Sequence, residues 1–491
     1  MAVRDRVRQK IVIHRSTTKK MQLLSLALAV LCGATFVAPS ERGRDTGFFA
    51  VWSDVHYYAN YTAGSPATCP AQAASRGCCG AHDWSVPPHR KAGEYGDYNC
   101  DSPDSLVNLT LDALARRHAE VGLDFVLLLG DSADHRLLEQ SVGSNLDSVR
   151  HVVRRYASRF PTTTGSSQAP RLFSVHGNHD TWPCDQLCPP EGAAGLYREV
   201  LGAVADAWEP WIGKEAAATV RHGGYYTALL PTGSVARSPV RLLSLETLWY
   251  SQLNVANLMQ GCGTAGDQQQ WDYVGHVLQA ARRGGERVWL VGHQFPGGSG
   301  MSQQWTDWVQ QLFVDYADVL AESFWGHSHT DRLLLFRGGA GGVGPAVGHG
   351  YVGPSVVPDE HFPAHRVYAY NRTTGRVLDY WQYGLNLTAA TAAAGPPDFK
   401  LLYRATEAYG LRDLSTRSWA EWADVQLPTN PAALARYWAN YHPGVDHGPC
   451  ELKSRCAREL FCDAQFANPD ARNACLEDVG PPPWNVLDGR A

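Results

Sequence analysis

The sequence predicts an α/β fold in which helices flank a mostly buried β-sheet. Six short apolar runs each end at a glycine or a polar residue, and stretches with helical spacing, such as residues 105–121 and 268–283, lie between them. Continuous apolar runs of this length are typical of strands buried on both faces. At 491 residues with 44% hydrophobic content, the chain is long enough to bury one large core or two.

Each predicted strand leads, in chain order, to side chains that commonly bind metals or substrates. Open α/β sheets place their sites at the C-terminal ends of strands, so these side chains are expected to gather there. The runs and the residues just beyond them are 48–52 with Asp54 and His56, 125–129 with Asp131, 171–175 with Asn178, 240–245 with Glu246, 288–291 with His293, and 319–325 with His327 and His329.

The C-terminal third is predicted to begin with a loop and to end in helices. The glycine-rich residues 338–350 are expected to form a flexible loop, and residues 391–397 are expected to mark a boundary. Residues 400–411 and 431–441 have helical spacing. Beyond them, four cysteines predict a small stapled helical tail: Cys450, Cys456, Cys462 and Cys475.

Residues 1–38 are predicted to be an export signal rather than part of the fold. A basic stretch over residues 1–20 precedes an uncharged apolar run over residues 21–38. The run is near the lower length limit for a membrane span, so it is either a cleaved signal peptide or an uncleaved signal anchor. The protein is therefore expected to be secreted or to lie in an endolysosomal or vacuolar lumen, or to be a type II protein anchored through residues 21–38.

The rest of the composition agrees with export. The chain has 12 cysteines, and four sequons predict N-glycans at Asn60, Asn108, Asn371 and Asn386. The net charge of -5 provides no basic field, which argues against a nucleic-acid scaffold. We expect a glycosylated monomer with disulfide bonds.

The side chains beyond the strands favour a two-metal site. Residues i and i+2 of an extended segment point the same way, so Asp54 can face one site with His56, and His327 with His329. Four imidazoles with carboxylates suit zinc, manganese or iron better than calcium or magnesium. Seven candidate ligands are too many for one tetrahedral ion, but they fit two ions that share a carboxylate. The seven are Asp54, His56, Asp131, Asn178, His293, His327 and His329.

The order of these motifs resembles the calcineurin-like metallophosphoesterase signature, D-x-H, G-D, G-N-H-[DE], G-H and G-H-x-H. Within it, the chain looks most like the acid sphingomyelinase-like phosphodiesterases. The resemblance lies in Cys69 with the pair Cys78-Cys79, in GEYGDYNCDSP (93–103), in FKLLYRATEAYGL (399–411), in Gly353-Pro354-Ser355 and in the spacing of the last four cysteines.

The resemblance implies a β-sandwich flanked by helices over residues 47–395 and a helical C-terminal domain over residues 396–480. It implies one zinc ion on Asp54, His56, Asp131 and His329, and a second on Asp131, Asn178, His293 and His327. A hydroxide between the metals would attack phosphorus in line. His135 and His179 would stabilise the transition state and protonate the leaving oxygen. The alternative for these two residues is a hydrogen bond to a ligand or to Asp180.

The resemblance also implies four disulfides, Cys69–Cys78, Cys79–Cys100, Cys450–Cys456 and Cys462–Cys475. Cys184 and Cys188 are close enough in sequence to pair with each other; otherwise Cys262 pairs with one of them. The family often has a bridge near the fifth motif, where GHQFPGGSG has no cysteine. The loop at this motif therefore departs from the family pattern, while the metal-ligand positions match it.

Other residues near the motifs are expected to have structural roles. Surface or loop positions are predicted for His176, His222, His361 and His365. Core or pocket-wall positions, rather than a membrane-binding surface, are predicted for Trp182, Trp249 and Tyr250.

The substrate is expected to be a small phosphorylated molecule. About fifteen residues separate the apolar segment from Asp54, which leaves no room for the saposin-type module of sphingomyelinase proper. Soluble nucleotides or choline phosphodiesters are therefore favoured, with sphingomyelin as another substrate. Two alternatives are an endopolyphosphatase or phosphatase of the same superfamily, and a catalytically silent binding protein.

Overall fold

The computed structural model describes most of the chain beyond the predicted export signal. Residues 1–38 lie outside the described residues. Of the predicted Cys69–Cys78 pair, Cys78 is described and Cys69 is not. Within the part of the chain that is described, no helix is both long enough and apolar enough to cross a membrane. The described residues are 45–68, 78–80, 90–161, 169–188, 195–232, 238–258, 265–359, 361–392, 397–446 and 448–478.

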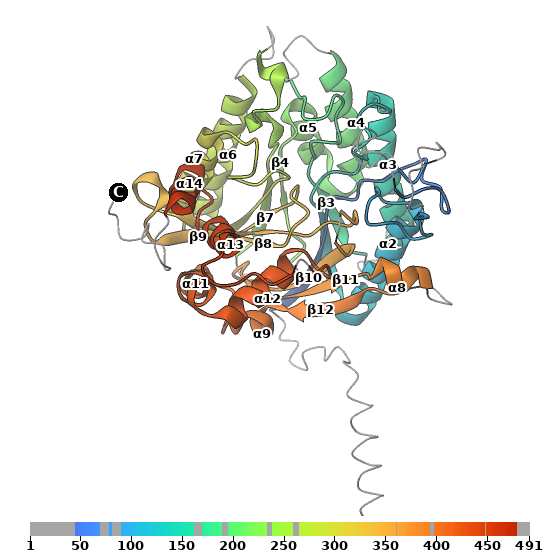
Figure 1. Ribbon diagram of the computed structural model, residues 1–491. Coiled ribbons are helices and arrows are strands. Elements are labelled where there is room, and N and C mark those ends of the chain that lie inside the picture. The colour runs from blue at the N-terminus through green and yellow to red at the C-terminus, as the bar shows by residue number, and fades with distance from the viewer. Residues whose placement is uncertain are drawn as a thin grey trace, which may run out of the picture. The chain divides into compact units, whose positions relative to one another are not determined.

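Two six-stranded sheets form the centre of the fold (Figure 1). The first has the order β12-β11-β10-β1-β2-β3, and the second has the order β4-β5-β6-β7-β9-β8. The strands are β1 (Thr46–Trp52), β2 (Leu123–Leu128), β3 (Arg171–Ser174), β4 (Tyr226–Leu229), β5 (Val240–Ser244), β6 (Arg287–Val291), β7 (Leu320–Trp325), β8 (Arg332–Arg337), β9 (Ala346–Val352), β10 (Ala364–Asn371), β11 (Val377–Gly384) and β12 (Lys400–Arg404).

The six strands predicted from the sequence are all present, divided equally between the sheets. β1, β2 and β3 are parallel neighbours in the first sheet, and β5, β6 and β7 are parallel neighbours in the second. The buried ring of Phe49 in β1 contacts Trp289 of β6 at 4.8 Å and Phe324 of β7 at 5.4 Å, measured between ring centroids. The two sheets therefore pack face to face on an aromatic core, which confirms the predicted α/β sandwich.

Helices cover the outer faces of both sheets. Figure 1 shows α2, α3 and α4 along one side of the molecule and α6 and α7 along the other. The helices are α2 (Asp104–Val121), α3 (Val142–Arg159), α4 (Gly195–Ile212), α5 (Lys214–Gly223), α6 (Ala265–Gly284), α7 (Gln303–Asp315), α8 (Leu387–Ala392), α9 (Ala405–Tyr409), α10 (Thr416–Glu421), α11 (Leu427–Thr429), α12 (Pro431–Tyr441), α13 (Arg455–Gln465) and α14 (Pro469–Glu477), with short 3-10 turns η2 (Leu248–Tyr250), η3 (Val255–Leu258) and η4 (Ala340–Gly342) and a π-helical turn η5 (Trp422–Gln426).

Two predictions in the C-terminal third are wrong in part. Residues 346–350 of the predicted flexible loop belong to β9, which continues to Val352 and pairs with both β7 and β8. Its glycines are required by close packing, because a Cβ at Gly348 would lie 2.2 Å from the Phe313 ring. Residues 400–404 of the predicted helix form β12, an edge strand on β11, and only α9 within that stretch is helical.

Of the histidines predicted at surface or loop positions, His176 and His361 do lie in loops, although both are buried, and His365 lies in a strand instead. His176 lies with its Nδ1 2.9 Å from Glu246 Oε2, and His361 contacts the Ser355 hydroxyl. His365 is in β10, where burial between Tyr383 and Phe399 lowers its pKa to about 3. His222 is exposed, as predicted.

The cysteines follow the predicted framework where they are described. Cys79–Cys100, Cys450–Cys456 and Cys462–Cys475 are formed. Cys78 and Cys188 are also disulfide-bonded, to partners outside the described residues. Cys184 is free, so the Cys184–Cys188 alternative is wrong.

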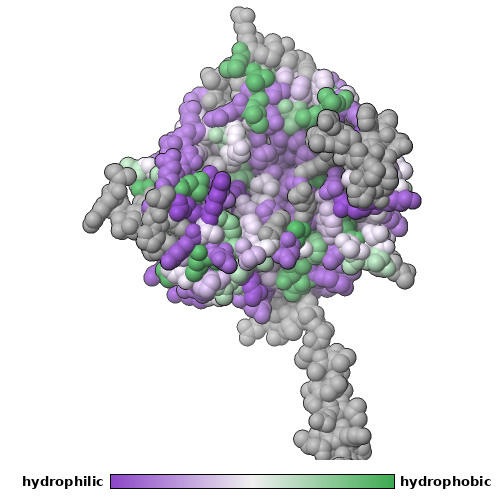
Figure 2. Space-filling view, viewed as in Figure 1, coloured by the Kyte–Doolittle hydropathy of each residue, from purple (hydrophilic) through white to green (hydrophobic). Residues whose placement is uncertain are grey.

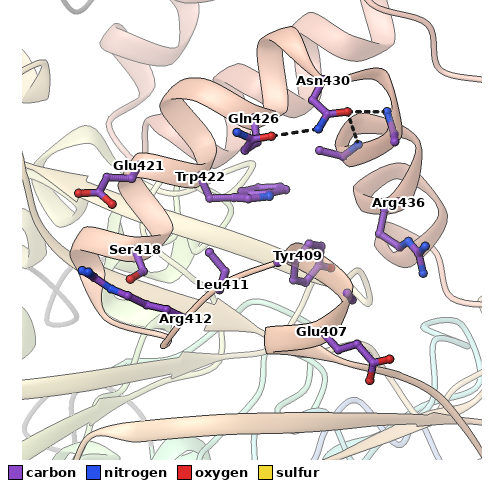
Figure 3. A pocket seen from close by; sticks show the side chains of 14 residues that line it. Glu407, Tyr409, Leu411, Arg412, Ser418, Glu421, Trp422, Gln426, Asn430 and Arg436 are labelled. Atoms are coloured by element: carbon purple, nitrogen blue, oxygen red, sulfur yellow. Dashed lines mark hydrogen bonds between the residues drawn. The ribbon is translucent and has the colours of Figure 1, made fainter.

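The C-terminal helices border a pocket of about 690 Å³ (Figure 3). Tyr409 and Trp422 line it, and Arg412 and Arg436 lie toward opposite ends of the view. Its lining includes none of the seven predicted ligands. The predicted boundary between residues 395 and 396 stays a prediction.

Candidate metal centre

All seven predicted ligands lie just beyond the C-terminal ends of parallel strands, and the structure brings them together. The connections after β1 and β2 are joined by a hydrogen bond from the Asp54 backbone N–H to the Gly130 carbonyl, at 3.1 Å. Those after β6 and β7 are joined by a bond from the Gly326 N–H to the His293 carbonyl, at 3.0 Å. Side-chain contacts then connect the residues from the two sheets.

Five of the seven residues have left-handed backbone conformations. Positive φ values are found at Asp54 (50°), His56 (43°), Asp131 (52°), His327 (76°) and His329 (59°). The segments are therefore not extended, and the argument from i and i+2 geometry is wrong, although each pair does face one site. Non-glycine residues rarely adopt positive φ, and such strain concentrates at functional sites.

The glycines of the motifs allow the loops to approach closely. A Cβ at Gly177 would lie 2.1 Å from the Asp131 backbone nitrogen. A Cβ at Gly326 would lie 2.6 Å from Ser53 Oγ and 2.9 Å from Asp54 Oδ2. Any side chain at these two positions would push the candidate ligands apart.

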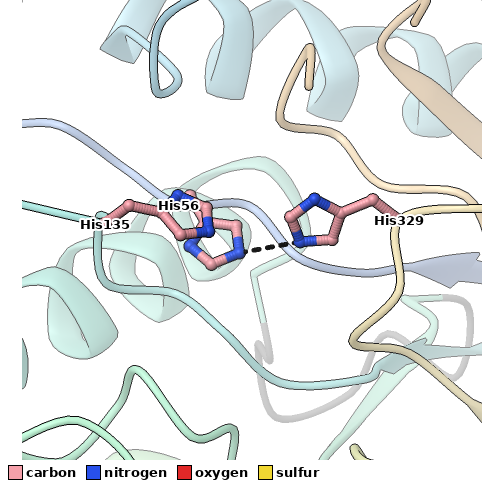
Figure 4. Close-up of side chains that lie close together, drawn as sticks. All are labelled: His56, His135 and His329. Carbon is pink, nitrogen blue, oxygen red and sulfur yellow. Dashed lines mark hydrogen bonds between the residues drawn. The ribbon is translucent and has the colours of Figure 1, made fainter. Parts of the chain in front are cut away.

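The first group of donors contains His56, His329, Asp54 and Asp131. His56 Nε2 lies 3.1 Å from His329 Nε2 and 3.5 Å from Asp131 Oδ2. His329 Nε2 lies 3.6 Å from Asp54 Oδ1. Figure 4 shows the rings of His56 and His329 directing nitrogens at each other.

The second group contains Asp131, Asn178, His293 and His327. His293 Nε2 lies 3.1 Å from Asp131 Oδ2 and 2.9 Å from Asn178 Oδ1. His327 Nδ1 lies 3.0 Å from the same amide oxygen. Asp131 Oδ2 thus contacts a histidine of each group.

The donor sets fit metal ions of the zinc type. Two ligands that each lie about 2.0–2.1 Å from one tetrahedral ion are separated by about 3.4 Å, which is close to the spacings in both groups. Three sets of side chains have ligand atoms close enough together to hold an ion: Asp131, His293 and His327; Asp54, His56 and Asp131; and His56 and His329 with His135, which was predicted as a catalytic residue and not as a ligand. The chemistry of imidazole nitrogens with carboxylate and amide oxygens suits such an ion.

The electrostatics of the site also favour a cation. Burial lowers the pKa of His56 well below its usual range and lowers the pKa of His327 to about 3, which keeps both imidazoles neutral, the form that binds metals. Burial opposes charge on His293 as well, but Asp131 and Asp54 outweigh it and raise its pKa to about 10. Burial raises the pKa of Asp54. At Asp131, burial acts in the same direction, but nearby histidines, above all His293, overcome it and hold the pKa of Asp131 well below its usual range. The Asp131 carboxylate therefore attracts positive charge to this point.

The two predicted catalytic histidines lie beside the first group. The His135 ring stacks on His56 at 3.6 Å, and its Nδ1 lies 2.6 Å from Asp101 Oδ1. The His179 ring lies 4.6 Å from that of His135, and its buried Nδ1 has no hydrogen-bond partner. Burial lowers the pKa of His179 to about 4.

The Asp180 carboxylate, which was considered as a hydrogen-bond partner of His179, instead binds backbone N–H groups. It accepts hydrogen bonds from the backbone N–H of Ser132 at 2.7 Å and of Gly177 at 2.9 Å. It holds the loops after β2 and β3 together.

Sequence reasoning missed three residues at this site. Asp101 lies within the stretch 93–103, but its bond to His135 joins residues 34 apart. Asp359 contacts His329 Nδ1 at 2.7 Å and lies in no recognised motif. The free thiol of Cys184 accepts from Asn178 Nδ2 at 3.5 Å, which turns the amide oxygen toward His293 and His327.

Trp249 and Tyr250 are core residues, as predicted. Both are buried, and Tyr250 stacks on Trp305 at 4.4 Å. Figure 2 shows hydrophobic residues in small groups among hydrophilic ones on the face viewed.

Comparison with known proteins identifies the family. A family profile described as "Acid sphingomyelin phosphodiesterase C-terminal region" matches residues 351–479. The mouse (Mus musculus) "Acid sphingomyelinase-like phosphodiesterase 3b" is 30% identical over 91% of this chain and 93% of its own length. The chain belongs to the acid sphingomyelinase-like phosphodiesterase family.

Other relatives of this family match over most of the chain. "Sphingomyelin phosphodiesterase A" of Dictyostelium discoideum is 30% identical over 86% of this chain and 67% of its own length. "Cyclic GMP-AMP phosphodiesterase SMPDL3A" of Rattus norvegicus is 29% identical over 75% of this chain and 80% of its own length. Membership makes the chain a metal-dependent phosphodiester hydrolase.

Proposed function

We propose that this chain is an exported phosphodiesterase with two zinc ions. Asp54, His56, Asp131 and His329 would hold one ion, and Asp131, Asn178, His293 and His327 would hold the other. The observation that carries the proposal is the convergence of both donor groups on Asp131 Oδ2, which lies 3.5 Å from His56 Nε2 and 3.1 Å from His293 Nε2.

The reaction proposed is hydrolysis by in-line attack of water on phosphorus. When bound, the two ions would supply Lewis acidity and make water a nucleophile near neutral pH. His135 and His179 lie at the edge of the first group. We assign proton donation to the leaving oxygen to His135, whose Nδ1 lies 2.6 Å from the Asp101 carboxylate, and stabilisation of the transition state to His179, because its pKa of about 4 keeps that ring neutral. Asp101 fixes the direction of the His135 ring through its Nδ1.

We propose soluble phosphodiesters, such as nucleotides or choline phosphodiesters, as the preferred substrates, with sphingomyelin as a poorer one. The names of the relatives include both a cyclic dinucleotide phosphodiesterase and sphingomyelin phosphodiesterases. Export with N-glycans at the four sequons is part of the proposal. It is supported by the disulfides of the fold, which form in oxidising compartments, and by the exposure of Asn60 and Asn386.

Chelation tests this function. Dialysis of the purified chain against a zinc chelator should reduce hydrolysis of cyclic GMP-AMP by at least about a hundredfold, and added zinc should restore it, whereas calcium should not. Sphingomyelin in detergent micelles should be cleaved more slowly. Initial rates at acidic and neutral pH measure both substrates. Turnover that persists unchanged without metal would contradict the proposal, and turnover of polyphosphate alone would favour the endopolyphosphatase alternative.

A further inference from the structure

The hydrogen bond between His329 and Asp359 connects a candidate ligand to a residue outside all the motifs. We propose that Asp359 is a positioning residue, which orients the His329 imidazole toward the first metal ion and strengthens its binding. The inference rests on the proposed function, because it assigns a role within the same two-metal site.

The geometry of the ring gives the reason. His329 Nδ1 donates to Asp359 Oδ2 at 2.7 Å, while Nε2 of the same ring lies 3.1 Å from His56 Nε2 and 3.6 Å from Asp54 Oδ1. A proton held on Nδ1 leaves the lone pair on Nε2, where the other donors converge. A carboxylate partner also makes the imidazole a more basic ligand.

Two other histidines of the site are oriented in a different way. His56 Nδ1 donates to the Ala133 carbonyl at 2.8 Å, and His293 Nδ1 donates to the Leu129 carbonyl at 2.7 Å. Both acceptors are backbone atoms and carry no net charge. In contrast, the acceptor at His329 is a charged side chain, which can be replaced without changing the main chain.

The segment that carries Asp359 is fixed to the strand end that carries Asp54. The backbone N–H groups of Val356 and Val357 donate to the carbonyls of Ser53 and Asp54, both at 3.0 Å. Ser355 Oγ donates to the Val357 carbonyl at 2.7 Å. The Gly353-Pro354-Ser355 stretch therefore begins the segment that places Asp359 next to His329.

The Asp359 side chain is 29% exposed, so the effect of removing it should be graded rather than complete. Partners of ligating histidines typically contribute about ten- to a hundredfold in metal affinity. We expect Asp359→Ala and Asp359→Asn to weaken one of the two zinc sites by that factor. The other site, which does not use His329, should keep its affinity.

The experiment is a zinc titration of metal-free protein in competition with a chromophoric chelator. The full chain is compared as wild type, Asp359→Asn, Asp359→Ala and Asp359→Glu, with circular dichroism to confirm folding. Asp359→Glu should recover part of the lost affinity. Asp398→Asn is the matched control, since Asp398 is an exposed carboxylate paired with Arg116. If the alanine variant does not fold, the asparagine variant carries the test.

Affinities of the Asp359 variants within twofold of wild type at both sites would overturn the role of Asp359 and leave the phosphodiesterase proposal intact. Equal weakening at both sites would also overturn it, because a positioning role acts through His329 alone. A wild-type chain that binds no zinc would overturn this inference and the proposed function together.

Discussion

Replacement of Asp131 by asparagine is expected to reduce kcat/KM for phosphodiester hydrolysis by at least about a thousandfold, because residues that act as one catalytic unit show losses of this size or more. Asp131 Oδ2 is the carboxylate oxygen that contacts a histidine in each donor group. Asparagine keeps the size of the side chain but removes the negative charge that two cations would share. Zinc content should fall from two ions per chain toward one.

Asp147→Asn is a suitable control for this change. Asp147 is an exposed aspartate of α3 whose side chain is 75% accessible and pairs with Arg150 on the surface. Its replacement should leave both activity and zinc content as in the wild type. The two-metal account would be wrong if Asp131→Asn kept more than about a tenth of the activity with two zinc ions bound.

The second large effect is expected on stability. Asp331→Ala should lower the free energy of unfolding by about 3–5 kcal/mol, the usual cost of breaking a buried ion pair by removing one partner. Asp331 Oδ2 lies 2.6 Å from the Arg366 guanidinium, and both side chains are almost completely buried. The Tyr403 hydroxyl donates to the same oxygen. Without the carboxylate, the Arg366 charge would remain in the core.

The position of Asp331 also connects stability to the candidate site. It lies two residues after His329, and its backbone N–H donates to the Tyr441 carbonyl of α12 at 3.0 Å. Chemical denaturation should therefore show the loss in stability, and zinc affinity should fall as the loop after β7 loosens. Glu421→Ala, which removes an exposed partner of Arg417, should leave the unfolding transition unchanged. Equal stability of the Asp331→Ala and Glu421→Ala variants would contradict this interpretation.

The sequence predicted the parts of the fold that short-range patterns encode. The six buried parallel strands have continuous apolar runs, and the candidate ligands follow these runs within a few residues. The sequence alone therefore located both the strands and the candidate ligands. β9 and β12 were missed for physical reasons. The glycines of β9 serve close packing against Phe313, and β12 is an edge strand whose outer residues are exposed.

The contacts around the candidate ligands could not be predicted in the same way. Asp101 and Asp359 each bond to a histidine at least 30 residues away along the chain. Contacts between residues so far apart in sequence produce no recognisable motif in a single sequence. The buried state of His365 depends on Tyr383 and Phe399, which come from two later segments. The left-handed conformations of Asp54 and His329 likewise could not be predicted, because positive φ is uncommon even for aspartate and histidine and no short pattern marks where it occurs.

The most direct test of the two-metal account is a crystal structure of the purified chain with diffraction data on both sides of the zinc absorption edge. Anomalous difference maps locate bound zinc without reference to activity. We expect two peaks on either side of Asp131, one beside His56 and His329 and the other beside His293 and His327. A single peak, or zinc bound away from these residues, would contradict the account.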